Sequence, residues 1–259
     1  YLERGELPEI PDADFAGRKM VEILEPGSIA ETGFEINKII IDPGHGGSDA
    51  GRVSSSGVQE KDINLDIATD LRNMLTERLG VEVVMTRESD DFLTLQERGE
   101  IANVQEADIF LSIHCNGWFH PDAGGFETYF LAPARTEEER RQAREENSVM
   151  QLEDPGMDPE KLEELDFILW DMVQNEFITE SSELAEIIQR ELDEVIAIRN
   201  RGVKQAGFRV LRGINMPAVL IEVAFLSNEK EEKLLQDPGF CRRVCEGIVE
   251  AVRKFSSGK

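Results

Sequence analysis

Short apolar runs and longer amphipathic segments alternate along the chain from residue 38 to its end. Runs rich in Val, Ile, Leu and Phe predict strands, and they cover 38–42, 81–86, 108–114, 125–131, 208–211 and 217–226. The segments between them carry apolar residues at helical spacing over 63–80, 94–107, 181–196, 228–235 and 238–255. This alternation predicts an α/β protein in which helices cover both faces of one sheet.

Two of the predicted helices begin with a recognisable pair of residues. Thr94 with Glu97, and Asn228 with Glu231, have the spacing of a capping box. In that motif each side chain binds the backbone N–H of the other residue, so we expect helices to begin at both sites.

Two segments depart from the alternation. Residues 1–36 are polar, hold three prolines and show no sustained period, so we expect a linker or N-terminal tail before a domain at 37–259. Within 134–180, an acidic tract at 135–154 precedes a Pro-Gly-Pro break and a tract at 159–177 that is apolar on more than one side. We expect a helical insert here, with its second helix buried or docked.

Charge and composition narrow the range of partners. The formal net charge is −25, which argues against nucleic acid and against an anionic membrane surface. The sequence has no apolar run long enough to insert into a membrane and no segment typical of an export signal. Because the first residue is Tyr1, we expect a fragment or a processed form. Cys115, Cys241 and Cys245 lack the spacing of a disulfide framework, which favours free thiols.

Two of the three histidines follow predicted strands. His45 comes just after the strand at 38–42, in Asp-Pro-Gly-His-Gly-Gly, and His114 ends the strand at 108–114. Sites in open α/β sheets gather at the carboxyl ends of strands, so both imidazoles can reach one point. His120 lies beside Pro121 in a segment without a strand or helix pattern, and we interpret it as a loop residue.

A carboxylate near the first histidine completes a metal-ligand set. Catalytic zinc sites use three N or O ligands and leave one position open. Glu60, fifteen residues after His45 and just before a predicted helix, is the candidate third ligand beside His45 and His114. The glycines around His45 let the backbone turn sharply, so that the ring can point inward. We therefore predict a zinc site, although His45 alone would fit a structural turn equally well.

Glu222 interrupts the most apolar predicted strand, at 217–226. A buried carboxylate is costly unless a metal or a hydrogen bond compensates, and desolvation raises its pKa toward values that suit a proton shuttle. We predict a catalytic role for Glu222. The alternative is a carboxylate on the solvent face of an edge strand.

Several motifs occur together in one order. They are IIIDPGHGGSDAG at 39–51, Glu60, TRESDDFLTLQERGEIAN at 86–103, ADIFLSIHCN at 107–116, GFETYFL at 125–131, RGVKQAGFRVL at 201–211 and MPAVLIEVAFLSNEKEEKLL at 216–235. In this order and spacing the chain resembles zinc-dependent N-acetylmuramoyl-L-alanine amidases, which are cell-wall hydrolases.

The resemblance implies a fold, a chemistry and a set of site residues. It implies a twisted, mostly parallel sheet, with zinc ligands at His45, Glu60 and His114 and a catalytic glutamate at Glu222. The implied reaction cleaves peptidoglycan between N-acetylmuramic acid and L-alanine, in the periplasm or outside the cell, during cell division and related remodelling. Four further residues recur in the family's motifs: Arg98, Asn64, Asn116 and Glu127. For each we expect a structural or orienting role rather than the alternative of direct catalysis, because residues around a metal site commonly orient its ligands.

The resemblance also implies a regulatory function for the insert at 134–180. In family members tied to cell division, a helix at this place covers the zinc cleft and lifts when an activator protein binds. We therefore expect an autoinhibitory insert in which a carboxylate takes the open zinc position, from among Glu138, Glu139, Glu145, Glu146, Glu164, Asp171 and Glu176. A pair of solvated charged helices is the alternative.

Two other functions stay open at this point. One is a non-catalytic module that binds peptidoglycan, which the loss of a ligand or of Glu222 would favour. The other is a zinc hydrolase that acts on a different amide.

Overall fold

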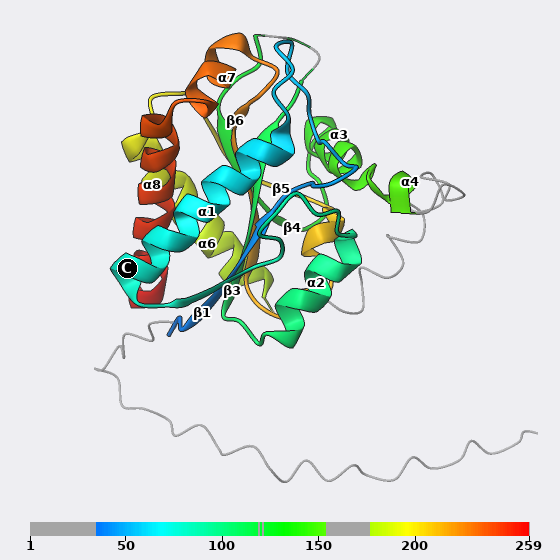
Figure 1. The fold of residues 1–259 in the computed structure, drawn as a ribbon. Helices are drawn as coiled ribbons and strands as arrows, with labels where there is room; N and C mark the ends of the chain where they lie inside the picture. The colour runs from blue at the N-terminus through cyan, green and yellow to red at the C-terminus, as the bar shows by residue number, and fades with distance from the viewer. Residues whose placement is uncertain (1–34, 119, 121, 154–176, 259) are drawn as a thin grey trace, which may run out of the picture. The chain divides into compact units, whose positions relative to one another are not determined.

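Six strands form one mixed sheet in a computed structural model that describes residues 35–118, 120, 122–153 and 177–258 (Figure 1). The strand order is β2-β1-β3-β6-β4-β5. The strands are β1 (Lys38–Pro43), β2 (Glu82–Met85), β3 (Ile109–Asn116), β4 (Phe126–Leu131), β5 (Asn200–Ala206) and β6 (Ala218–Phe225).

Strand direction decides which residues meet at each edge of the sheet. Strands β2, β1, β3 and β6 are parallel neighbours, so their carboxyl ends lie together. Strand β4 is antiparallel to β6 and parallel to β5, which brings the amino ends of β4 and β5 to that same edge. The predicted mostly parallel α/β sheet is confirmed.

Helices cover both faces of this sheet. On one face, α1 (Glu60–Leu79), α6 (Ile178–Val195) and α8 (Pro238–Ser257) pack over strand residues such as Ile39 and Leu111 in one apolar core (Figure 1). On the other face, α2 (Leu95–Val104), the 3₁₀ helix η1 (Arg209–Leu211) and α3 (Glu137–Asn147) lie over a second core that includes Ile40 and Phe110. Alternate residues of β1 and β3 thus enter opposite cores, as pleated strands require.

The helix caps explain where several helices begin. Thr94 and Glu97 form the predicted capping box at α2. Asn228 caps α7 (Glu229–Leu235) as predicted, but the reciprocal bond of a capping box is not made. Instead, the Glu231 carboxylate accepts hydrogen bonds from the backbone N–H groups of Phe225 and Gly125. Glu231 therefore ties β6 to the loop before β4, a role that spacing alone does not reveal.

One predicted strand is wrong. In the predicted run 208–211, Arg209–Leu211 form the 3₁₀ helix η1 with Phe208 as its N-cap, and the strand lies earlier, at β5. Strand β5 has a polar sequence because it is the edge strand of the sheet, and much of it is only partly buried.

The insert is described only in part. The acidic tract forms α3, turns at residues 148–149 and continues as the short α4 (Met150–Glu153). Most of the second predicted helix, at 159–177, lies outside the described residues, as does the predicted tail apart from residues 35 and 36. Among the helices of the described ranges, none combines the length and apolar character of a membrane span. Cys115, Cys241 and Cys245 are free thiols, as predicted.

Candidate active site

His45 lies just past β1 in an uncommon backbone conformation. Its φ is 61°, a region that residues other than glycine rarely adopt. Arg98 Nη2 donates to the carbonyl oxygen of His45 at 2.8 Å, and Arg87 Nη2 donates to that of Gly44 at 2.9 Å. His45 Nδ1 forms a 2.7 Å hydrogen bond with Asp49, which leaves Nε2 pointing toward the site. The loop thus aims one ring nitrogen, and the surrounding hydrogen bonds hold the strained backbone in place.

His114 approaches the same point from the neighbouring strand. It lies in β3, which pairs with β1, and the two imidazole ring centroids are 4.9 Å apart at 75°. The predicted convergence of His45 and His114 at the carboxyl edge of the sheet is therefore observed. His120 lies exposed in the loop between β3 and β4, where the sequence predicted a loop residue.

Glu60, the first residue of α1, contacts both histidines with one oxygen. Glu60 Oε1 is 3.2 Å from His45 Nε2 and 3.2 Å from His114 Nδ1. The same oxygen accepts from the backbone N–H of Cys115 at 3.0 Å, and Oε2 accepts from that of Arg52 at 2.8 Å. Both oxygens are thereby fixed, so the carboxylate is held in place against the two rings.

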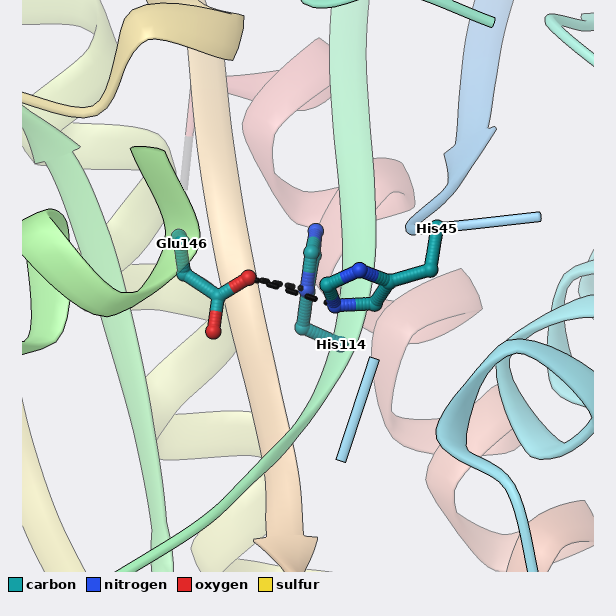
Figure 2. A group of neighbouring side chains, drawn as sticks. All are labelled: His45, His114 and Glu146. Carbon is teal, nitrogen blue, oxygen red and sulfur yellow. Dashed lines mark ion pairs between the residues drawn. The ribbon is translucent and has the colours of Figure 1, made fainter. Parts of the chain in front are cut away.

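Glu146, on α3, also reaches the two histidines, and its carboxylate points toward both rings (Figure 2). Glu146 Oε2 lies 3.3 Å from His45 Nε2 and 3.1 Å from His114 Nδ1. Among the acids that the sequence offered, Glu138 and Glu145 pair with cations, and Glu139 caps α3. The remaining three candidates, Glu164, Asp171 and Glu176, lie outside the described residues.

Among the described residues, His45, His114 and Glu146 each offer one ligand atom, and these three atoms lie within 4.8 Å of one another, as a shared metal ion requires. Glu60 is not part of that group, although its Oε1 contacts both imidazoles. Bonds of about 2.0–2.1 Å to a tetrahedral ion place neighbouring ligand atoms roughly 3.3 Å apart. The four contacts between the carboxylate oxygens and the ring nitrogens span 3.1–3.3 Å. Within the described ranges, His45 Nε2 and Glu146 Oε2 are buried without a hydrogen-bond partner. Buried polar atoms without partners need an explanation, and a metal ion held between them supplies one.

The charges of the cluster are strongly coupled. Burial alone would lower the pKa of His114, but the Glu146 charge raises it to about 10. Burial raises the pKa of Glu146, but the His114 charge outweighs this and holds it at about 2. Within the cluster, protonated histidines therefore balance the negative charges of the carboxylates. A bound divalent cation would supply that positive charge instead, and the imidazole rings that bind it must be neutral.

Glu222 stands beside His114 on the central strand β6. The two residues are register partners, and on the other side Glu222 is paired with Glu127 of β4. Glu222 is fully buried, so the alternative of a solvent-facing carboxylate on an edge strand is wrong. Burial, and then the Glu146 charge, raise the pKa of Glu222 well above its usual value.

One contact of Glu222 was not foreseen from the sequence. Gln142, on α3, donates from Nε2 to Glu222 Oε1 at 2.9 Å, while Glu222 Oε2 has no hydrogen-bond partner among the described residues. Gln142 lies one helical turn before Glu146, so α3 contacts both the histidine cluster and the buried carboxylate. The sequence did contain one indication of this contact, because Gln142 and Glu146 are four residues apart and so lie on the same face of a helix.

The residues with expected orienting roles surround the cluster. Asn64 donates to Glu60 Oε1 at 3.2 Å, and Asn116 donates to Glu127 Oε1 at 2.6 Å. Arg98 forms a buried 2.8 Å ion pair with Asp42 under the His45 loop. Each contacts a residue of the cluster or its supporting loop rather than the space between the histidines.

Gly44 supplies the space that the His114 ring occupies, and we predict that Gly44→Ala weakens metal binding. A Cβ atom there would lie 2.3 Å from His114 Nε2, closer than any real contact. The His114 ring must then shift, and disturbing the groups that orient a metal ligand typically costs roughly 10–100-fold in metal affinity. Competition titration with a zinc chelator measures this loss. Gly99→Ala is the control, because its Cβ would meet nothing nearer than 3.5 Å; equal affinity in both variants would contradict the assignment.

The fold and the cluster together define an α/β protein with a candidate metal centre and an adjacent buried carboxylate at the carboxyl edge of the sheet. Comparison with known proteins then identifies the family. A family model described as N-acetylmuramoyl-L-alanine amidase matches residues 39–254, and the chain belongs to that family.

Individual relatives agree with this assignment. N-acetylmuramoyl-L-alanine amidase AmiC of Neisseria meningitidis is 35% identical over 217 residues, which cover 84% of this chain and 52% of that protein. AmiA of Escherichia coli K12, an amidase of the same description, is 34% identical over 224 residues, covering 84% of this chain and 75% of that protein. The crystal structure of an N-acetylmuramoyl-L-alanine amidase from Clostridium difficile 630 superposes with a TM-score of 0.67 at 30% identity, covering 85% of this chain and 97% of that one. The chain spans about half the length of the Neisseria relative.

Proposed function

We propose that this protein hydrolyses the amide bond between N-acetylmuramic acid and the L-alanine of the peptidoglycan stem peptide, with zinc as its cofactor. Membership of the amidase family supports the reaction. The observation that carries the chemistry is Glu60 Oε1 at 3.2 Å from both imidazoles, with Glu222 in register beside His114. As the family acts on peptidoglycan, the proposed location is the periplasm or the cell exterior.

Each residue of the cluster has a role in this proposal. His45, Glu60 and His114 hold the zinc, and Asp49 fixes the His45 ring through Nδ1. Zinc, when bound, lowers the pKa of water toward about 7 and polarises a carbonyl group. Glu222 accepts the proton of the attacking water and delivers it to the leaving amine. A raised pKa suits both halves of that transfer, because Glu222 must bind the proton and then release it.

We propose that the described arrangement is a closed, autoinhibited state, and two contacts of α3 support this. Glu146 Oε2 lies 3.1 Å from His114 Nδ1, where it would act as a ligand in place of the water or substrate of an open catalytic site. Gln142 donates a hydrogen bond to Glu222 Oε1. Both residues belong to α3, so one displacement of that helix frees the metal centre and the base together. We propose that an activator protein displaces the 134–180 insert, as in regulated members of the family that act in cell division.

Metal content and products together test this function. We expect about one zinc per chain by elemental analysis, and release of soluble stem peptides with a free L-alanine amine from purified sacculi, identified by mass spectrometry. Chelation should abolish the release and added zinc should restore it. Zinc binding without any cleavage, even after Glu146 is replaced, would favour a peptidoglycan-binding module. Cleavage at another amide would redirect the substrate assignment.

A further inference from the structure

An irregularity in the edge strand β5 brings two cations to one face of the sheet. Strand register runs from Phe126 opposite Asn200 to Thr128 opposite Val203, so two residues of β5, Arg201 and Gly202, face the single residue Glu127. Gly202 has φ 82°, which accommodates the extra residue. Such bulges are rare between parallel strands, and they re-aim side chains next to active sites.

The bulge changes which side chains share a face. Residues three apart in a regular strand point to opposite faces, which would separate Arg201 from Lys204. With one extra residue between them, both side chains reach the same carboxylate. Arg201 Nε donates to Glu127 Oε2 at 2.7 Å, and Lys204 Nζ lies 2.6 Å from that oxygen.

A carboxylate from α3 also contacts this cation pair. Glu138 Oε1 accepts from Arg201 Nη2 and, at 3.0 Å, from Lys204 Nζ. The side chains of Arg201 and Lys204 are 13% exposed, whereas that of Glu138 is 40% exposed. Glu127 is therefore the buried support of the pair, and Glu138 is the outer, removable partner.

The charge balance around Arg201 and Lys204 changes if α3, and with it Glu138, moves away. Two cations and two carboxylates balance in the described arrangement. Without Glu138, Glu127 is the one carboxylate that the described residues still offer to the pair, and one of the two positive charges then lacks a partner among them in a partly buried position. The guanidinium and ammonium groups already converge on one oxygen of Glu138, a geometry that suits another carboxylate. An uncompensated cation beside the site is notable in a chain of net charge −25.

We propose that Arg201 and Lys204 form a carboxylate-binding subsite for the peptide part of the substrate, and that Glu138 occupies it in the closed state. The proposal rests on the proposed function, because it assumes that α3 moves and that the substrate is a peptide-bearing amide. Glu222 lies on β6, Glu127 on the neighbouring β4, and the subsite cations on β5, the next strand along. Neighbouring strands are about 4.8 Å apart, so two strand spacings place the subsite roughly 10 Å from Glu222. An extended peptide covers that distance in about three residues. The ligand class is therefore an acidic peptide whose carboxylate lies within a few residues of the scissile bond.

Peptide binding to the zinc-loaded full chain tests the subsite without relying on turnover. The probes are short peptide amides that begin with L-alanine and carry glutamate at the second or third position, each compared with its glutamine counterpart. In the Glu146→Ala background we expect at least one glutamate peptide to bind roughly tenfold more tightly than its counterpart, as one charge-assisted hydrogen bond implies. Adding Lys204→Gln or Arg201→Gln should reduce that ratio to about one. Calorimetry measures the affinities, and thermal melting verifies folding.

The controls separate this subsite from general electrostatics. Arg253→Gln removes one exposed positive charge on α8 and should leave the ratio unchanged. Lys204→Gln is the decisive variant if Arg201→Gln does not fold, since Arg201 also contacts the Phe225 ring. A ratio near one in the Glu146→Ala background, no binding of either peptide, or a ratio that survives Lys204→Gln would overturn the subsite. Failure of the proposed function appears separately, as zinc-loaded Glu146→Ala protein that releases nothing from sacculi.

Discussion

Glu222→Gln is expected to abolish peptidoglycan hydrolysis while the protein keeps its zinc and its fold. The substitution preserves the shape of the side chain and removes only the group that accepts the proton. Loss of a general base typically costs roughly 10²–10⁴-fold in rate, and here the same group also delivers the proton to the leaving amine. Release of stem peptides from sacculi, followed over time, measures the loss.

The stability of the same variant strengthens the test. Glu222 is fully buried, and burial raises its pKa, so the folded protein disfavours its ionised form. A neutral isostere at this position should leave the melting temperature unchanged or raise it. Glu250→Gln, which removes an exposed carboxylate from α8, is the control for the change in charge. Substantial turnover by folded, zinc-loaded Glu222→Gln protein would remove Glu222 from the mechanism.

The sequence was sufficient to predict those residues of the site that lie at the ends of strands. His45 and His114 end neighbouring apolar runs, and parallel strands bring such ends together, so their convergence could be predicted. Glu222 stood out because a carboxylate is costly between buried neighbours. These inferences depend on local pattern and on one general property of α/β sheets.

The parts that could not be predicted depend on register and on tertiary contact. Strand β5 is polar because it lies at the edge, and the bulge that aligns Arg201 with Lys204 exists only relative to β4. The choice of Glu146 among seven acidic candidates depends on how α3 packs, since Glu139 and Glu145 have equally suitable chemistry and other partners. Spacing in the sequence carries no information on these contacts.

Glu146→Ala is expected to raise basal amidase activity by roughly tenfold or more in the absence of an activator. The substitution removes the oxygen that lies 3.1 Å from His114 Nδ1 and 3.3 Å from His45 Nε2, and with it the main attraction of α3 to the metal centre. A tenfold change requires a shift of only about 1.4 kcal/mol between the closed and open states, which is within the contribution of one buried ionic contact. Deletion of 134–180 is a less selective test, because it also removes the first turn of α6, which begins at Ile178.

A matched control lies on the same helix. Glu137→Ala removes a 69% exposed carboxylate that pairs only with α3 arginines among the described residues, so it should leave basal activity unchanged. Stem-peptide release by equal amounts of folded, zinc-loaded protein compares the two variants with the parent chain. Equal or lower activity in Glu146→Ala would show that the contact between Glu146 and the histidines does not limit the enzyme. Glu138 and Glu145 also hold α3 through Arg201, Lys204 and Arg52. Adding Glu138→Gln to Glu146→Ala should therefore raise basal activity still further on an N-acetylmuramoyl peptide without acidic residues.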